Sequence, residues 1–219
     1  PRPAAHIAAG ARARPGARPT PPPDVMLSNA CKGIDVSRHH LKGLYVCTVR
    51  KRRKALGGSS TEVICTLRDD CAGDGAEEDS AEEDGAQEHA EYRPIHFRFP
   101  DARVTMRPWN PYTCVIAAAV HNRLIHLPIH PGSSILALGC PLRTLSHLAE
   151  IVHTSGRVIG IIDRRAKQPT SRELATFFRR YPCATIVIDD IQAATFERYE
   201  RMLSLPRASK HAFLMALHP

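Results

Sequence analysis

The second half of the chain alternates between short apolar runs and stretches with helical spacing of apolar residues. Runs rich in Ile, Val, Leu and Ala predict buried strands at 134–139, 157–162, 184–188 and 211–217. Segments with an apolar face at the spacing of an α-helix separate these runs, and they predict helices over 111–121, 144–153, 171–180 and 196–203. Strands that alternate with helices predict a parallel sheet with right-handed crossovers, which is an α/β fold.

The predicted helices carry recognisable faces and ends. Leu145, Leu148, Ile151 and Val152 form one apolar face of helix 144–153. In helix 171–180, Ser171 is the expected N-cap, and Leu174, Phe177 and Phe178 are expected to point inward. Pro111 is expected in the first turn of helix 111–121, where its missing N–H is no loss.

The first half of the chain has the pattern of a small β unit. Residues 43–49 and 62–67 are rich in β-branched side chains and predict two strands joined as a hairpin. Strand-like alternation resumes over 92–105. The hairpin loop carries five consecutive cations, which favour contact with phosphates or another acidic partner over a solvated turn: Arg50, Lys51, Arg52, Arg53 and Lys54.

Charge is distributed unevenly over the 219 residues. Segment 69–91 holds 11 of the 22 acidic residues and none of the 30 Lys and Arg, so it is expected to be a low-complexity insertion. The remainder has a surplus of 19 positive charges, which favours a polyanionic partner, RNA or an anionic surface, over a merely basic soluble protein.

The first residues are built from Ala, Pro, Arg and Gly and contain no acid before Asp24. This composition cannot bury a core, so an extended or disordered basic arm is expected. Arg12, Arg14 and Arg18 are its candidate RNA contacts, although an Arg-rich, acid-poor segment also fits mitochondrial targeting. The expected organisation is an arm over 1–33, a β domain over 34–107 and an α/β domain over 108–219.

Composition argues against several other classes of protein. No apolar run approaches the about 18 residues of a membrane-spanning helix. The 7 Cys are widely spaced without a Cys-x-x-Cys pair, and we interpret them as small core residues in a reducing compartment. The 12 His form no convincing metal face, so no metal site is expected.

An ordered set of motifs resembles the fibrillarin family. The most specific is Trp109-Asn110-Pro111-Tyr112 followed by Ala117-Ala118-Ala119. Further similar pieces lie in the same order along the chain: His40–Cys47, Ser146–Leu148, Glu150–Val152, Gly156, Val158 and Ile188–Asp190. The resemblance implies a Rossmann-like sheet of S-adenosylmethionine-dependent rRNA 2′-O-methyltransferases, here partial with about four parallel strands, in box C/D ribonucleoproteins.

The cofactor positions implied by the resemblance are altered. Gly139 and Asp190 match cofactor-binding positions and are expected to be vestigial. The loop after the first strand has Pro141, Leu142 and Arg143 where small residues are expected, and Pro141 removes an N–H donor. Ile162 stands where the resemblance places the carboxylate that holds the ribose, and Asp163 comes one residue later, on the opposite face of a strand.

The catalytic positions implied by the resemblance are also altered. Val115 stands at the position of a lysine and Leu217 at that of an aspartate, so no catalytic residue is assigned. Methylation of a 2′-hydroxyl needs a base or a tightly oriented oxygen beside the methyl donor. The sequence predicts four parallel strands, fewer than the sheet of a complete methyltransferase contains. We therefore expect either a longer native chain or a partner protein or RNA that covers strand 211–217.

Two functions follow from these observations. The first is a non-catalytic RNA-binding or scaffold subunit of a ribonucleoprotein (a ribosome, its assembly intermediate or an rRNA-processing particle) without a cofactor. Its partners would be rRNA or guide RNA and the proteins of that particle. The alternative is an active rRNA 2′-O-methyltransferase that uses S-adenosylmethionine. The resemblance implies the nucleolus, and the basic arm is also compatible with a mitochondrial ribosomal complex.

Overall fold

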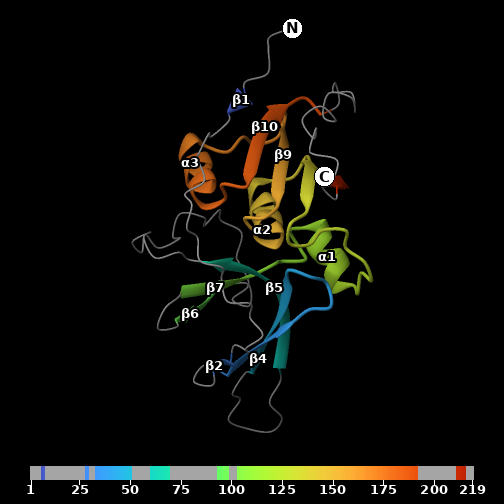
Figure 1. Ribbon diagram of the computed structural model, residues 1–219, viewed down its shortest axis with the longest axis vertical. Coiled ribbons are helices and arrows are strands. Elements are labelled where there is room, and N and C mark those ends of the chain that lie inside the picture. Colours follow the sequence, from blue (N-terminus) through green and yellow to red (C-terminus); the bar gives the residue numbers. More distant parts are fainter. Residues whose placement is uncertain are drawn as a thin grey trace. The chain divides into compact units, whose positions relative to one another are not determined.

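The computed structural model describes residues 6–7, 28–29, 33–50, 60–69, 93–98, 103–191 and 211–215. The chain forms two compact units, one from residues 17–124 and the other from residues 1–16 together with 125–219 (Figure 1). We call them the antiparallel unit and the parallel unit. This division groups residues by contact, and the domain boundaries predicted at residues 33 and 107 stay predictions.

The antiparallel unit is built on a six-stranded sheet with the order β2-β3-β4-β5-β7-β6. Every neighbouring pair in it is antiparallel. The strands are β2 (Ser28–Asn29), β3 (Ile34–Arg38), β4 (Leu44–Arg50), β5 (Ser60–Asp69), β6 (Ile95–Arg98) and β7 (Arg103–Pro108). The predicted hairpin is confirmed, since β4 pairs with β5 and Cys47 lies opposite Val63. Its loop, residues 51–59, lies outside the described residues, as does the acidic insertion after Asp69.

The core of this sheet follows from alternation along its strands. Side chains of a strand point alternately to the two faces, and one face here carries the buried set Ile34, Val36, Cys47, Val63, Cys65, Phe97 and Met106. Burial of such side chains stabilises by about 1.5–3 kcal/mol each for the large aliphatic and aromatic ones. Burial of this set favours the observed register of the hairpin, because a slip by one residue would move all of these side chains to the other face of the sheet.

Helix α1 (Val115–His121) also belongs to the antiparallel unit and begins four residues later than predicted. The backbone N–H of Tyr112 donates to the side-chain Oδ1 of Asn110 at 2.8 Å, which closes a turn over Pro111. Cys114 is then extended, with φ −144° and ψ 120°, and serves as the N-cap. The prediction that Pro111 lies in the first helical turn was wrong, because the Asn110 side chain stabilises a separate turn before the helix.

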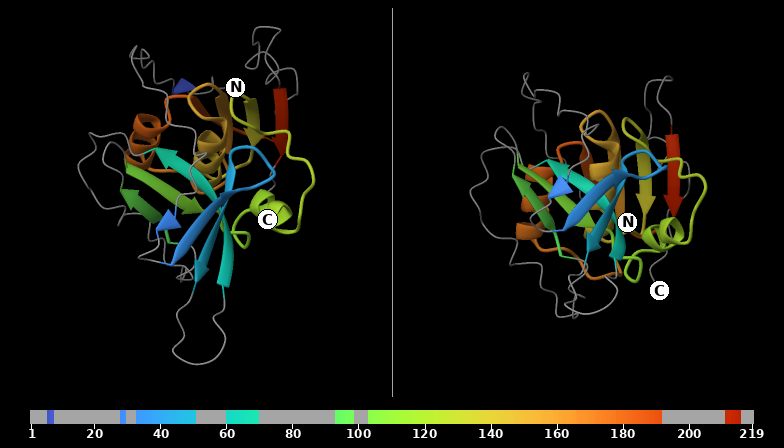
Figure 2. Two further views of the ribbon diagram at one scale, coloured as in Figure 1. Left: turned by 60° about the horizontal axis from the view of Figure 1, so that its bottom comes forward. Right: turned by 90° about the horizontal axis from the view of Figure 1, so that it is seen from below.

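The parallel unit contains a five-stranded sheet with the order β1-β10-β9-β8-β11. Its strands are β8 (Ser134–Leu138), β9 (Arg157–Asp163), β10 (Ala184–Asp189) and β11 (His211–Met215), with β1 (His6–Ile7) at one end. The pairs β8–β9, β9–β10 and β8–β11 are parallel, and β1–β10 is antiparallel. The red arrow of β11 points the same way as the yellow arrow of β8 beside it (Figure 2). The α/β class with a parallel sheet is confirmed. The predicted helix 196–203 lies outside the described residues.

Two helices connect the strands of the parallel sheet. Helix α2 (Leu142–Val152) joins β8 to β9 and buries the predicted apolar face of Leu145, Leu148, Ile151 and Val152. Helix α3 (Ser171–Arg180) joins β9 to β10. Its N-cap is Thr170 and the prediction of Ser171 was wrong: Thr170 and Glu173 form a capping box in which each side chain bonds the other's backbone N–H.

The parallel sheet has buried side chains on both of its faces. Leu136, Ile159, Ile161 and Val187 form a buried cluster on one face, and Gly160, which alternates with Ile159 and Ile161 along β9, lies on the other face, toward α2. Leu145 of α2 approaches Gly160 of β9 so closely that a Cβ added to Gly160 would lie 2.4 Å from a Leu145 methyl carbon. The absence of a side chain at Gly160 therefore permits this helix to lie on the sheet. No helix within the described part of the chain is long and apolar enough to cross a membrane.

Candidate functional site at the carboxyl edge of the parallel sheet

The carboxyl ends of β8, β9 and β10 meet at one edge of the parallel sheet. Asp163 ends β9 directly opposite Asp189, which ends β10, and Gly139 follows the end of β8. Crevices outside the carboxyl ends of parallel strands are the usual location of ligands in α/β folds. The two residues predicted as cofactor positions, Gly139 and Asp190, are thus both at this edge.

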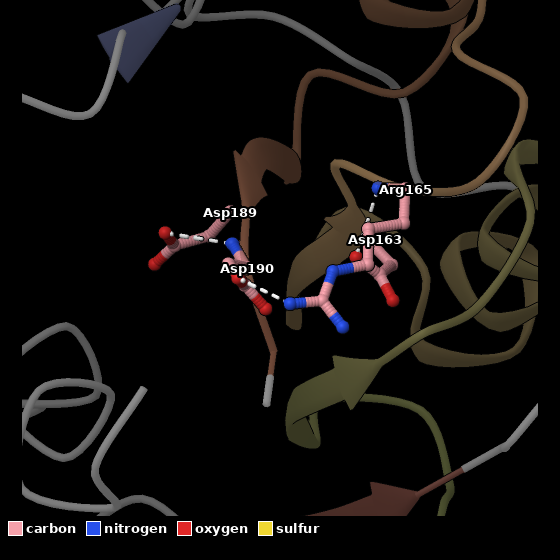
Figure 3. A network of polar contacts seen from close by, with 4 residues as sticks. All are labelled: Asp163, Arg165, Asp189 and Asp190. Carbon is pink, nitrogen blue, oxygen red and sulfur yellow. Dashed lines mark hydrogen bonds and ion pairs between the residues drawn. The ribbon is translucent and has the colours of Figure 1, made fainter. Parts of the chain in front are cut away.

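An ion pair joins the turns that follow β9 and β10 (Figure 3). Nη2 of Arg165 donates to Oδ2 of Asp190 at 3.0 Å, with 59% of the arginine side chain and 30% of the aspartate side chain exposed. The backbone N–H of Arg165 donates to Oδ1 of Asp163 at 3.0 Å. Asp189 is buried and points away from Arg165, and its Oδ1 accepts from the backbone N–H of Asp190 at 2.9 Å. The carboxylates at this edge therefore all have partners from the chain itself.

Local hydrogen bonds hold the segment between β9 and α3 in place. Nε2 of Gln168 donates to the carbonyl oxygens of Asp163 at 2.7 Å and Ala166 at 2.9 Å. The backbone N–H of Arg164 donates to the carbonyl oxygen of Asp189 at 2.8 Å, which ties the segment to the end of β10. Arg165 is thereby placed where its guanidinium reaches Asp190.

The loop after β8 retains a glycine turn but has a proline at the start of α2. Gly139 has φ +67°, a left-handed conformation that suits glycine, and its N–H donates to the carbonyl oxygen of Ile161 at 2.8 Å. Pro141 is the N-cap of α2, with φ −66° and ψ 158°, and it accepts from the N–H of Leu145. The backbone N–H of Gly139 is consequently bonded to β9, and residue 141 has no N–H to offer a ligand.

The residues at this edge do not fit S-adenosylmethionine in the manner that the resemblance implies. Ile162 stands at the position expected for the ribose-holding carboxylate, and it is aliphatic and only 4% exposed. Asp163 comes one residue later and accepts a hydrogen bond from its own turn. An aliphatic side chain cannot accept the two hydrogen bonds of a ribose diol.

The Trp109–Tyr112 turn lies in the antiparallel unit and has a different character. Trp109 is buried, and its backbone N–H donates to the carbonyl oxygen of Ile64 at 2.8 Å, which fixes the turn to β5. Tyr112 is 82% exposed and Val115, the first residue of α1, is 65% exposed. Val115 therefore presents an aliphatic side chain to solvent at the position that the resemblance gives to a lysine. Leu217 lies outside the described residues.

Most of the predicted RNA contacts also lie outside the described residues: Arg12, Arg14, Arg18, Lys51, Arg52, Arg53 and Lys54. Arg50 is described, ends β4 and is exposed. Its Nη2 lies 2.7 Å from Oδ2 of Asp35 on β3, so one carboxylate already neutralises part of its charge. The assignment of these eight residues to RNA binding stays a prediction.

The titratable side chains with shifted pKa values do not form a second reactive site. Hydrogen bonding to the Cys47 thiol, together with burial, raises the pKa of Cys65 well above its usual value, and burial raises the pKa of Cys183. Both thiols are therefore poor nucleophiles at neutral pH. No group of three or more His, Cys, Asp or Glu side chains within the described ranges could hold a metal ion.

Sequence reasoning missed three polar features of the parallel unit. The first is the Arg165–Asp190 pair, whose members are 25 residues apart and so carry no local signal. The second is the Thr170–Glu173 capping box, which a Thr-x-x-Glu spacing does signal. The third is a buried contact in which the Tyr181 hydroxyl donates to Oε1 of Glu150 at 2.7 Å, while Nδ1 of His147 lies 3.7 Å from Oε2.

A parallel sheet with polar groups gathered at its carboxyl edge, together with a separate antiparallel sheet, defines an α/β protein of the kind that places nucleotide ligands at that edge. The fibrillarin family model matches residues 83–204, more than half of the chain. The chain therefore belongs to the fibrillarin family.

Curated relatives match shorter stretches. The fibrillarin-like rRNA/tRNA 2′-O-methyltransferase of Thermococcus onnurineus is 45% identical over 56 residues, which are 25% of this chain and 25% of the relative. The rRNA 2′-O-methyltransferase fibrillarin of Eremothecium gossypii is 32% identical over 92 residues, 42% of this chain and 27% of the relative. The matched part thus spans about a quarter of the length of these curated relatives.

Two solved structures are similar to the chain over a larger part. Aeropyrum pernix fibrillarin, solved with natively bound S-adenosylmethionine, has 27% sequence identity and a TM-score of 0.48, covering 77% of this chain and 60% of that one. The Methanococcus jannaschii fibrillarin pre-rRNA processing protein has 22% identity and a TM-score of 0.44, covering 72% of this chain and 55% of that one.

Proposed function

We propose that this fibrillarin-family chain is a non-catalytic RNA-binding subunit that serves as a scaffold in a ribonucleoprotein particle, either a ribosome, an assembly intermediate or an rRNA-processing particle. The observation that carries the non-catalytic part is the buried, aliphatic Ile162, one residue before the end of β9. The resemblance places the carboxylate that orients the ribose of the cofactor at this position. Asp163, which ends the strand, leaves the opposite face of the strand and accepts a hydrogen bond from its own turn. Val115, exposed at the expected lysine position, leaves that position without a proton acceptor.

The Arg165–Asp190 ion pair supports the proposal only weakly on energetic grounds. Both side chains are substantially exposed, and an exposed pair stabilises by about 0–1 kcal/mol. A cofactor with micromolar affinity gains about 8 kcal/mol and could displace such a pair. The proposal therefore relies on the residue at position 162 rather than on the ion pair.

The RNA-binding part of the proposal is supported by charge and by family. The chain carries 30 Lys and Arg against 22 Asp and Glu, and half of the acids are confined to segment 69–91. Relatives in the family are named as rRNA or rRNA/tRNA 2′-O-methyltransferases. An excess of cations outside one segment favours contact with a phosphate backbone. We accordingly propose rRNA or guide RNA as the partner and the nucleolus as the location, with a mitochondrial ribosomal complex as the alternative.

A protein partner is proposed at strand β11. Within the described residues β11 is the last strand of the sheet and pairs only with β8. A strand with one unpaired side favours addition of a strand from another chain or cover by a loop. Hydrogen exchange on the isolated chain and on the purified particle tests this point. Slower exchange at residues 211–215 in the particle is expected, and equal exchange in both samples would refute it.

Titration calorimetry with S-adenosylmethionine tests the non-catalytic proposal. The wild-type chain is expected to show no binding at millimolar cofactor, while Aeropyrum pernix fibrillarin serves as a positive control. The variant Ile162→Glu introduces a carboxylate at the position that the resemblance gives to the ribose-holding group, and Ile162→Gln is the matched uncharged control. Binding regained only by the Glu variant supports the proposal, and micromolar binding by the wild-type chain overturns it.

An active rRNA 2′-O-methyltransferase remains the second candidate, because two features of a cofactor edge are retained. Gly139 keeps a left-handed φ of +67° after β8, and Asp190 keeps a carboxylate after β10. Methyl transfer from labelled cofactor to rRNA, with guide RNA present, tests this candidate. Transfer by the wild-type chain that is lost in Asp190→Ala would establish it and would end the scaffold proposal.

A further inference from the structure

Helix α3 places two exposed arginines on one line along its outer face. Arg172 and Arg179 are seven residues apart, close to two helical turns, so their side chains leave the same side of the helix about 10 Å apart along its axis. Both are exposed. Within the described residues, neither guanidinium makes a hydrogen bond or an ion pair. The apolar side of the helix is opposite, with Leu174 and Phe177 buried.

The surroundings of this arginine line contain little negative charge. Glu173 is the one acidic residue of α3, and its carboxylate accepts from the Thr170 hydroxyl at 2.7 Å as part of the capping box. Arg164, also exposed, lies in the segment that leads into the helix. The outer residues between the two arginines are Ala175 and Thr176, which are small enough for another backbone to approach closely.

We propose that the outer face of α3, through Arg172 and Arg179 with Arg164 beside its start, binds the sugar-phosphate backbone of RNA. This inference rests on the proposed RNA-binding function and specifies a surface for it. A guanidinium pairs with phosphate through two parallel hydrogen bonds. Two arginines about 10 Å apart on one face of a helix can therefore each contact a phosphate of the same RNA strand.

The same face argues against the other partners of a cationic helix. A helix that lies on a membrane surface needs large apolar side chains toward the lipid. In α3 those side chains, Leu174 and Phe177, are buried in the parallel unit. An acidic protein is the remaining competitor, and the experiment includes it. Arg179 also lies in the last helical turn, where a cation stabilises the helix dipole, so the readout must separate binding from helix stability.

Fluorescence anisotropy with the full chain and a labelled 20-nucleotide single-stranded RNA of mixed sequence tests the inference. The double variant Arg172→Glu/Arg179→Glu is expected to bind at least about tenfold more weakly, since two charge-assisted contacts to phosphate are lost and two like charges replace them. The slope of log K against log salt is expected to become less negative by about 1.4, or about 0.7 for each lost phosphate contact. A role in helix stability alone would leave this slope unchanged.

Two controls accompany the double variant. Arg157→Glu/Arg123→Glu changes the net charge equally at two exposed arginines outside α3 and its preceding segment, and it is expected to keep most of the affinity. Arg172→Gln/Arg179→Gln tests the same positions without charge reversal, and circular dichroism checks that α3 remains folded. Its affinity is expected to lie between those of the wild type and the Glu variant.

The possible outcomes separate this inference from the proposed function. Suppose that the wild type binds the RNA, and that Arg172→Glu/Arg179→Glu loses no more affinity for it than the control Arg157→Glu/Arg123→Glu does. The α3 surface is then refuted and the RNA-binding function stands. If the wild type does not bind this RNA at all, both fail. If polyglutamate binding depends on Arg172 and Arg179 and RNA binding does not, the face serves an acidic protein and the inference is overturned.

Discussion

Removal of a single hydroxyl group tests the buried polar contact of the parallel unit. The Tyr181 hydroxyl donates to Oε1 of Glu150 at 2.7 Å, and it joins the C-cap of α3 to the last turn of α2. Both residues are buried. The variant Tyr181→Phe keeps the ring and its packing and removes only the donor, so the change in stability measures this hydrogen bond directly.

The expected loss follows from the burial of the acceptor. Removal of the donor leaves a buried acceptor oxygen unsatisfied, which costs about 1–3 kcal/mol, and water cannot easily replace the lost donor there. Nδ1 of His147 lies near the other carboxyl oxygen, at 3.7 Å, and does not replace a donor to Oε1. For a chain of this size, a loss of about 1–3 kcal/mol lowers the melting temperature by about 2–12 °C.

Urea denaturation followed by circular dichroism measures this loss, and a double-mutant cycle with Glu150→Gln assigns it to the pair. The coupling energy between the two changes is expected to reach about 1 kcal/mol or more. Tyr112→Phe is the matched control, because the Tyr112 side chain is 82% exposed and its hydroxyl can bond to water. A loss below about 0.5 kcal/mol in Tyr181→Phe, or no coupling to Glu150, would show that the contact is not a stabilising hydrogen bond.

The remaining predictions concern packing, salt and pH. Gly160→Ala is expected to lower the free energy of unfolding by about 1–3 kcal/mol in urea titrations, because the new methyl group meets Leu145. The second change Leu145→Val should recover part of this loss. An unaltered urea midpoint in Gly160→Ala would contradict the close contact. Arg165→Ala is expected to cost no more than about 1 kcal/mol, less at high salt, and a larger or salt-independent loss would argue against an exposed ion pair. Burial, and secondarily the charge of His40, lowers the pKa of His39, so the unfolded chain binds the proton more readily and stability should fall as the pH drops below about 6.5. His39→Gln should reduce this fall, and an identical pH profile in the variant would refute the assignment.

Features that arise from neighbours in sequence were predictable, and those that depend on particular side-chain choices were less so. The spacing of four apolar residues predicted the buried face of α2, and the structure confirms it: Leu145, Leu148, Ile151 and Val152. The bounds of α3 were predicted correctly, but its N-cap was missed by one residue because Thr170 and Ser171 are both good N-caps, and only the Glu173 spacing favours Thr170. The start of α1 was missed because the Asn110 side chain stabilises a turn over a proline that is equally suited to a helix.

The candidate site illustrates a second limit. The positions of Gly139 and Asp190 at one edge could be expected, because the carboxyl ends of parallel strands meet there. The ion pair between Arg165 and Asp190 could not, because it depends on how the turn after β9 is folded by Asp163 and Gln168. The register of β9 with β10 places the turns after these two strands side by side. The hydrogen bonds within the turn after β9 then determine that Arg165 contacts Asp190.

The pairing of β1 with β10 has a consequence for the order in which the chain folds. Ile7 lies opposite Ile186, so this contact closes a loop of about 180 residues. Closing a flexible loop of that length costs about 4–5 kcal/mol in chain entropy. Two paired residues supply hydrogen bonds of only about 0.5–1.5 kcal/mol each. The segment His6–Ile7 should therefore join the sheet only after β8, β9 and β10 have assembled, and its amides should be the first of the sheet to exchange with solvent.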